Sequence, residues 1–175
     1  MLFELPLSVS VKHRIPWLIV GLLGGILAAK AIGFFEGTLT KNLVLAAFIP
    51  LVVYMSDAVG TQMEAFIIRD LAVNPRLNFL RYLTKQLQIV ILIASIISVI
   101  LFLASILLYR DFDIGKVLGI TLFSAIISSV FTGLIIPYLL SRLKFDPADA
   151  SGPIATIIQD ILSVIIYFGI ASLIL

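Results

Sequence analysis

The sequence contains no cysteine and one histidine, His13, among its 175 residues. The absence of cysteine excludes disulfides, thiolate metal sites and thiol catalysis. One histidine cannot build a typical zinc or copper site, which makes soft-metal transport and histidine-based catalysis poor explanations. The chain also contains no Gly-rich phosphate loop and no Ser-His-Asp set. We therefore predict that the protein is not an enzyme.

Charged residues are also scarce, at 13% of the chain, where a soluble domain has about 25%. Hydrophobic residues make up 61%, and the mean hydropathy is +1.20. This composition leaves too little polar surface to cover a water-soluble globule. The net charge of +2 is too small to indicate a nucleic-acid partner. The composition therefore predicts an integral protein of the cell membrane, in contact with membrane lipid.

The few charged residues divide the chain into five apolar segments, each long enough for the roughly 20 residues that a membrane helix needs. The connections between the segments are short, so we predict an all-α protein with one transmembrane ion-transport domain over residues 1–175. Residues 1–14 are expected to form a cytoplasmic or interfacial segment before the first span. The predicted spans are 16–35, 43–68, 87–109, 117–140 and 153–175.

Lysine and arginine are distributed unequally between the two sides of the predicted bundle. Eight lie on the side of the N-terminus, and four lie on the other side or near it: Lys30, Lys41, Arg110 and Lys116. Because cytoplasmic loops carry the excess of these residues, we expect the N-terminus in the cytoplasm and the C-terminus outside. Three acids give the outer face a negative character: Glu36, Asp111 and Asp113.

Three acidic residues lie within the predicted spans. Asp57 and Glu64 belong to span 43–68, and Asp160 belongs to span 153–175. A carboxylate at the bilayer centre costs about 2.5–3.5 kcal/mol, so three facing lipid would cost roughly 8–10 kcal/mol. We therefore expect the three acids to face the bundle interior or a water-filled cavity.

The spacing of polar residues gathers the acids on two stripes. Asp57 and Glu64 are seven residues apart and share one helix face, and a second stripe is formed by Thr156, Asp160, Ser163 and Tyr167. Both stripes are typical of the walls of a cation pathway. The alternative is that the acids are protonated or hydrogen-bond a neighbouring helix.

The available ligands are carboxylate, hydroxyl and carbonyl oxygens, which suit hard cations. Mg²⁺ is usually held by one or two carboxylates and retained waters, whereas Ca²⁺ takes six to eight oxygens. A sparse acidic site therefore favours hydrated Mg²⁺, with Mn²⁺ and Ca²⁺ as further candidates. A pathway for protons or Na⁺ would also use buried acids.

Several short motifs resemble the transmembrane domain of the MgtE family of magnesium channels and transporters, and of related eukaryotic solute carriers. The similarity covers nearly the whole chain, and its most specific part is the pattern of the last span. The motifs are Arg14-Ile15-Pro16-Trp17-Leu18, Phe35-Glu36, Leu45-Ala46-Ala47-Phe48-Ile49-Pro50-Leu51, Gly60-Thr61-Gln62, Asp146-Pro147-Ala148, and Ser151-Gly152-Pro153 with Thr156 and Asp160.

The resemblance implies a parallel homodimer in which spans 43–68 and 153–175 of both subunits line a central pore. Asp160 matches the acid that binds Mg²⁺ in the family's pore, and Asp146 matches an acid near the cytoplasmic mouth. We expect the metal-binding set to be Asp160, Asp57, Glu64, Thr156 and Asp146. The expected pore-lining residues are Gly60, Thr61, Gln62, Gly152, Pro153 and Ser163.

The sequence departs from the family pattern at Ser56-Asp57-Ala58, where the family usually has Gly-Gly-Asn. The chain also starts almost at its first span, so we expect no cytoplasmic regulatory domain of the kind that many members carry. The favoured function is a divalent-cation channel or transporter. The alternatives are an exchanger coupled to H⁺ or Na⁺ through Asp57 or Glu64, and a membrane subunit that transports nothing and binds a partner helix.

Overall fold

The computed structural model describes residues 6–35 and 43–175, and five α-helices account for nearly all of them. Each helix is long and apolar enough to cross a membrane. This confirms the predicted all-α fold with five spans. Glu36 and Lys41, two of the residues assigned to the outer side, lie outside the described residues. The helices are α1 (Leu7–Gly33), α3 (Leu43–Val73), α4 (Phe79–Tyr109), α5 (Phe112–Arg142) and α6 (Pro147–Ile174).

The helices run beyond the predicted spans at most of their ends. Helices α3, α4 and α5 each have 31 residues and are therefore about 46 Å long, whereas the hydrocarbon core is about 30 Å thick. A charged residue marks where an apolar segment ends, but the helix itself ends where a capping group interrupts it. Helix α1 begins at Leu7, so the described part of the N-terminal segment is continuous with the first span.

The last helix begins at Pro147, six residues before the predicted start at Pro153. The carboxylate of Asp146 accepts a hydrogen bond from the Ala148 amide at 2.9 Å, which makes Asp146 the N-cap. Pro147 follows at the first helical position, where its missing N–H costs nothing. Pro153 lies inside the helix.

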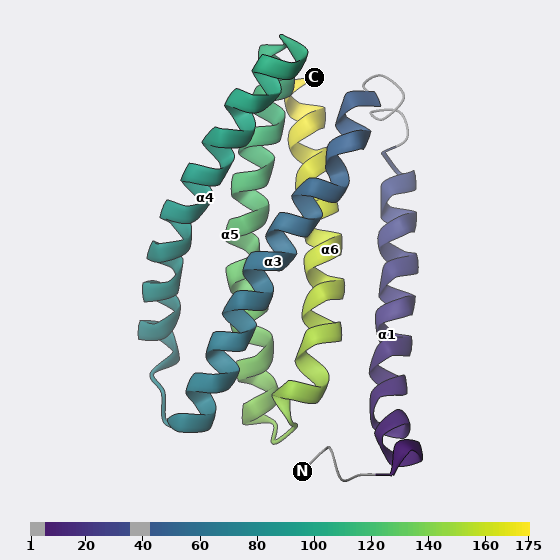
Figure 1. Ribbon diagram of the computed structural model, residues 1–175, viewed down its shortest axis with the longest axis vertical. Coiled ribbons are helices and arrows are strands. Elements are labelled where there is room, and N and C mark those ends of the chain that lie inside the picture. The colour runs from purple at the N-terminus through teal and green to yellow at the C-terminus, as the bar shows by residue number, and fades with distance from the viewer. Residues whose placement is uncertain (1–5, 36–42) are drawn as a thin grey trace.

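Helix α5 forms the centre of the bundle and is its most buried helix. It packs against α3, α4 and α6, and α3 crosses in front of α5 and α6 (Figure 1). Helix α1 stands at the edge, where α6 is its main neighbour and most of its surface is exposed. The chain therefore brings α3 and α6, which carry the three membrane acids, into direct contact.

Helices α3 and α5 approach each other closely at two glycines. A Cβ atom added to Gly133 of α5 would collide with the backbone carbonyl oxygen of Gly60 on α3. It would also lie 3.1 Å from the Cβ atom of Met63. The backbone of a helix cannot move away from such a contact without separating the two helices, so Gly133 fixes their spacing.

We expect Gly133→Ala to lower the free energy of unfolding by about 1–3 kcal/mol, the usual cost of overpacking a core. Gly169→Ala is the matched control, because a Cβ at Gly169 of α6 has no neighbour within 4 Å. That control should leave stability unchanged or slightly raised, since alanine favours a helix more than glycine does. Thermal unfolding in detergent would measure both, and equal effects of the two variants would contradict the packing argument.

Candidate functional site

Two of the three predicted membrane acids, Asp57 on α3 and Asp160 on α6, lie near the middle of their helices. Asp57 lies fourteen residues after Leu43 and sixteen before Val73, and Asp160 lies thirteen after Pro147 and fourteen before Ile174. Each acid is therefore close to the midpoint of a helix that can cross a membrane. Both side chains are half-buried and keep part of their surface open to the outside of the subunit.

Asp57 connects the two predicted stripes. The hydroxyl of Thr156 on α6 donates a hydrogen bond of 3.4 Å to the Asp57 carboxylate on α3. Asp160 lies one helical turn after Thr156, on the same face of α6. The structure thus brings Asp57 to the stripe of Thr156 and Asp160, although Asp57 is about 100 positions from both in the chain.

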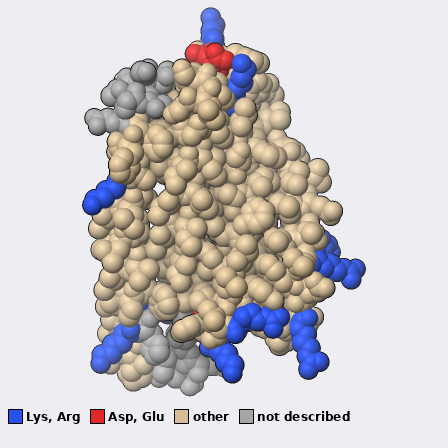
Figure 2. Space-filling model, turned by 180° about the vertical axis from the view of Figure 1, so that it is seen from behind, with Lys and Arg blue, Asp and Glu red and all other residues tan. Residues whose placement is uncertain are grey.

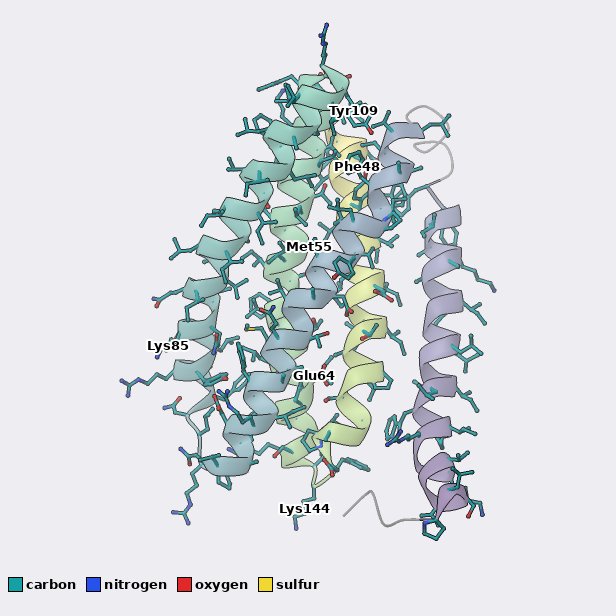
Figure 3. The ribbon with its side chains drawn as sticks, viewed as in Figure 1. Phe48, Met55, Glu64, Lys85, Tyr109 and Lys144 are labelled. Atoms are coloured by element: carbon teal, nitrogen blue, oxygen red, sulfur yellow. The ribbon has the colours of Figure 1, made fainter. Side chains whose placement is uncertain are left out.

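Glu64 lies about 10.5 Å along α3 from Asp57, opposite the first turns of α6 (Figure 3). The Ser151 hydroxyl is within hydrogen-bond distance of a Glu64 carboxylate oxygen and lies 2.5 Å from the Pro147 carbonyl oxygen. Its single proton can serve one of these acceptors at a time. Gly152 is also adjacent, since a Cβ placed on it would lie 3.7 Å from Glu64 Oε1.

A narrow crevice joins Asp57 and Glu64 between α3, α5 and α6, and it has room for about one water molecule. A hydrated cation is larger than one water and does not fit there. The face available to such an ion is the open side of the stripe, where Thr61 is exposed. Gln62 is also exposed, but its position in the helical turn places it on nearly the opposite side of α3 from Asp57 and Glu64. The crevice is lined by Asp57, Gly60, Thr61, Glu64, Thr132, Gly133, Ala155, Thr156 and Gln159.

The remaining predicted pore residues have different environments. Gly60 is buried against α5, and Gly152 and Pro153 are partly exposed near Glu64. Ser163 is fully buried, and its hydroxyl lies 2.8 Å from that of Ser56 on α3. Ser163 therefore joins α3 to α6 inside the subunit, and Ser56, a departure from the family pattern, is its partner.

Gln159 is a polar residue of the site that the sequence analysis did not single out. It is 2% exposed, and its Oε1 accepts a hydrogen bond of 2.8 Å from the Thr132 hydroxyl. Its Nε2 lies 3.0 Å from Ser163 Oγ, 3.1 Å from Ser128 Oγ and 3.2 Å from the Ala125 carbonyl oxygen. An amide in an apolar membrane helix needs hydrogen-bond partners on a neighbouring helix. A glutamine within the apolar span 153–175 could therefore have indicated this contact from the sequence alone.

Asp146 lies apart from the other acids. It is exposed at the start of α6, fourteen residues and about 21 Å before Asp160 along the helix. The structure gives it a capping role at that position, which does not require an ion.

Two substitutions separate the cap from the charge of Asp146. Asp146→Ala should lower the free energy of unfolding by about 1 kcal/mol, because it removes the N-cap acceptor. Asp146→Asn keeps an acceptor oxygen and should unfold like the unmodified protein in a thermal scan. If Asp146→Asn lowers cation flux without lowering stability, the charge itself acts at the mouth of the pathway. An equal loss of stability in both variants would contradict the capping role.

No cluster of three or more acidic or histidine side chains that could hold a metal ion is found within residues 6–35 and 43–175. A hydrated Mg²⁺ needs only one or two carboxylates, because retained waters complete its octahedral shell. The open stripe with Asp57, Thr156 and Asp160 provides ligands of that kind and number.

Comparison with known proteins gives a consistent result. A family model described as MgtE, divalent cation transporter, matches residues 49–170. A magnesium transporter MgtE of Bacillus subtilis is 37% identical over 97% of the chain, and one of Enterococcus faecalis is 33% identical over 97%. One of Thermus thermophilus is 28% identical over 93%. The chain spans 36–38% of the length of these relatives.

Proposed function

The chain belongs to the MgtE family of divalent cation transporters, and from this membership we propose that it moves Mg²⁺ through a pore on the axis of a homodimer. The membership confirms the resemblance seen in the motifs, and the family is one of transporters rather than enzymes. With its five membrane-crossing helices, the chain is a multi-pass protein of the cell membrane.

One observation carries the proposal: carboxylates lie half-exposed at the midpoints of two membrane-crossing helices. Each would cost about 2.5–3.5 kcal/mol if its open side faced lipid. A second copy that presents the same stripe across a water-filled path removes this cost. It also places two copies of Asp160 on opposite sides of one ion.

The proposed mechanism needs only these side chains and water. Asp160 of each subunit neutralises a largely hydrated Mg²⁺ on the axis, and Asp57 with Thr156 provides a neighbouring position. Glu64 provides a further acid toward the N-terminal side of the bundle. Binding must remain weak enough at each position for the ion to leave. The path between these positions is lined by Thr61, Gly152 and Pro153.

The distribution of charge supports an orientation with the N-terminus in the cytoplasm. Lysine and arginine side chains gather at the end of the bundle that carries the start of α1 (Figure 2). The opposite end carries Asp111 and Asp113 beside Arg110 and Lys116. Since cytoplasmic loops carry the excess of basic residues, the ion would enter at the end of the bundle with these acids.

Coupled exchange is a second candidate, and the position of Asp57 favours it. Asp57 lines the same crevice as Glu64 and accepts a hydrogen bond from Thr156, which lies one helical turn before Asp160. A proton or Na⁺ on Asp57 would therefore change the binding of a divalent ion at either neighbour.

Flux into proteoliposomes distinguishes these functions. The purified protein should carry Mg²⁺, and Mn²⁺, Ca²⁺ and Na⁺ tested in the same way would establish selectivity. Flux that is independent of imposed pH and Na⁺ gradients supports a passive pore, and flux that follows either gradient supports exchange. No flux of any ion would contradict both and favour a subunit that binds a partner helix.

The homodimer has a test of its own, because the chain contains no cysteine. Thr61→Cys, at an exposed position beside Asp57 and Glu64 on the α3 stripe, should cross-link to its copy in the membrane after oxidation. Leu92→Cys, on the exposed surface of α4, is the control and should remain monomeric on a denaturing gel. Equal cross-linking of the two variants would contradict an interface at α3 and α6.

A further inference from the structure

A groove lies on the other side of the central helix, between α4 and α5. Its volume is about 340 Å³, a size typical of binding pockets for small molecules. Its walls are largely apolar and include Val99, Phe102 and Phe123. Neither α4 nor α5 carries any of the proposed pore acids, so this groove has no part in the function proposed above.

The groove contains a buried hydroxyl without a partner. Ser98 is 6% exposed, and its Oγ has no hydrogen-bond partner within the described part of the chain. The other serines of α4 bond to their own helix: Ser95 to the Ile91 carbonyl at 2.7 Å, and Ser105 to the Phe102 carbonyl at 2.8 Å. Buried polar groups are nearly always paired, so Ser98 indicates a missing acceptor in the groove.

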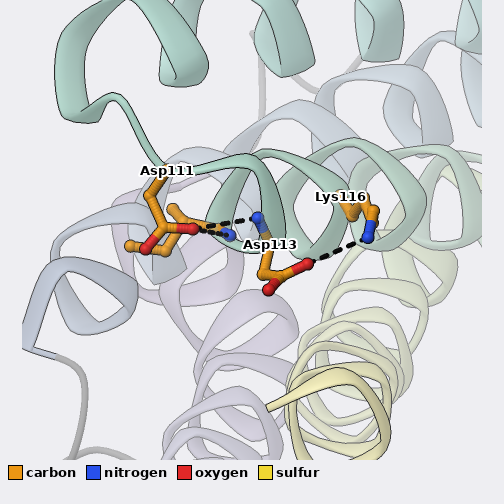
Figure 4. Close-up of polar contacts among 4 residues, drawn as sticks. Asp111, Asp113 and Lys116 are labelled. Carbon is orange, nitrogen blue, oxygen red and sulfur yellow. Dashed lines mark hydrogen bonds and ion pairs between the residues drawn. The ribbon is translucent and has the colours of Figure 1, made fainter.

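The ammonium group of Lys116 lies at one end of the same groove. Lys116 Nζ donates to the Asp113 carboxylate at 2.9 Å (Figure 4). It also lies 4.7 Å from the centre of the Phe112 ring. An ammonium has three donors, so two remain for another acceptor. Lys116 precedes Gly119 by three residues, and a Cβ on Gly119 would lie 3.4 Å from the Ser98 carbonyl oxygen. The backbone of Lys116 is therefore about 4.5 Å further along the bundle axis than the level of Ser98.

We propose that this groove binds one glycerophospholipid of the surrounding membrane. An acyl chain lies along Phe123, which is four residues beyond Gly119 on the side away from Lys116, an ester carbonyl accepts the hydrogen bond of Ser98, and the phosphate binds Lys116. The order of the three contacts matches that of the lipid, in which the ester lies between the apolar chain and the charged head. The occupant comes from the bilayer because Val99 and Ile120 at the groove are about half-exposed on the outer surface of the bundle.

Photolabelling with a defined lipid tests the proposal. The full chain would be reconstituted in vesicles containing a phosphatidylcholine with a diazirine on its acyl chain, and labelled residues would be mapped by mass spectrometry. Label should concentrate on the residues that line the groove. Ser98→Ala and Lys116→Gln should each lower that labelling by about fivefold, the loss expected for one hydrogen bond or contact of this kind.

Two pairs of variants make the result specific. Val99→Trp, which fills the groove, should abolish the labelling, whereas Leu103→Trp, on an exposed part of α4 outside it, should not. Lys85→Gln is the control for Lys116→Gln. Label spread evenly over the exposed helices, or equal labelling in Val99→Trp and Leu103→Trp, would overturn the proposal. Cross-links from the groove to a second copy of the chain would also overturn it.

Discussion

Replacing Asp160 with asparagine should lower Mg²⁺ flux by about 100-fold or more at low Mg²⁺ concentration. In the proposed dimer the substitution removes two charged ligands at once. Each charge-assisted interaction contributes about 1.5–3 kcal/mol, and every 1.4 kcal/mol corresponds to a factor of ten in affinity. The fold should survive, because asparagine has a similar size and no charge to bury at the middle of the membrane. Flux in proteoliposomes and thermal unfolding in detergent would be measured on the same preparation.

Asp70→Asn is the matched control for the loss of one acid. Asp70 forms an exposed ion pair with Arg69, with 2.9 Å between Nε and Oδ1, and accepts a hydrogen bond from the Tyr82 hydroxyl. Asparagine keeps an acceptor for that hydroxyl, and an exposed pair is worth at most about 1 kcal/mol. Flux should therefore be unchanged in this variant. Unchanged flux in Asp160→Asn as well would remove Asp160 from the pathway.

Substitutions of Gln159 should lower the stability of the fold, whereas Asp160→Asn should lower flux and leave the fold intact. Gln159→Leu preserves the volume of the side chain and removes its hydrogen bonds to α5 and to Ser163. Such bonds in membrane proteins average about 0.6 kcal/mol each, and the amide can form three at once, two from Nε2 and one to Oε1, so their loss corresponds to about 2 kcal/mol. Gln159→Ala also opens a cavity, and the total loss should reach about 3–5 kcal/mol. Unfolding in mixed micelles would measure both values.

Gln88→Leu, at an exposed glutamine on α4, is the control for this series and should have little effect on stability. We expect the free energy of unfolding to be lowest for Gln159→Ala and higher for Gln159→Leu. That of Gln88→Leu should be close to the value of the unmodified protein. A stability of Gln159→Leu equal to that of the unmodified protein would show that the network does not hold α6 against α5.

The spans and the family could be predicted from the sequence, because both depend on features that are local in the chain. A membrane helix is recognised by the length of an apolar segment, and the motif around Ser151-Gly152-Pro153 and Asp160 lies within fifteen positions. Helix ends were predicted less well. Hydropathy does not report a cap such as Asp146, which starts α6 six residues earlier than expected.

The candidate site could be predicted only in part. Helical spacing placed Asp57 with Glu64 and Thr156 with Asp160, and the structure brings these stripes together. Spacing could not show which side of a stripe a neighbouring helix covers. For this reason it did not predict that Ser163 is buried against Ser56, or that Gln159 forms a hydrogen-bond network with α5. The orientation, the homodimer and the ligands of the ion remain predictions.

A structure of the protein with Mn²⁺ in place of Mg²⁺ tests the central claim most directly, since Mn²⁺ takes the same hard oxygen ligands and can be located by its anomalous scattering. The account predicts one metal peak on a two-fold axis between the Asp160 carboxylates of two subunits. Asp160 packed away from its copy, with the metal bound elsewhere, would contradict it.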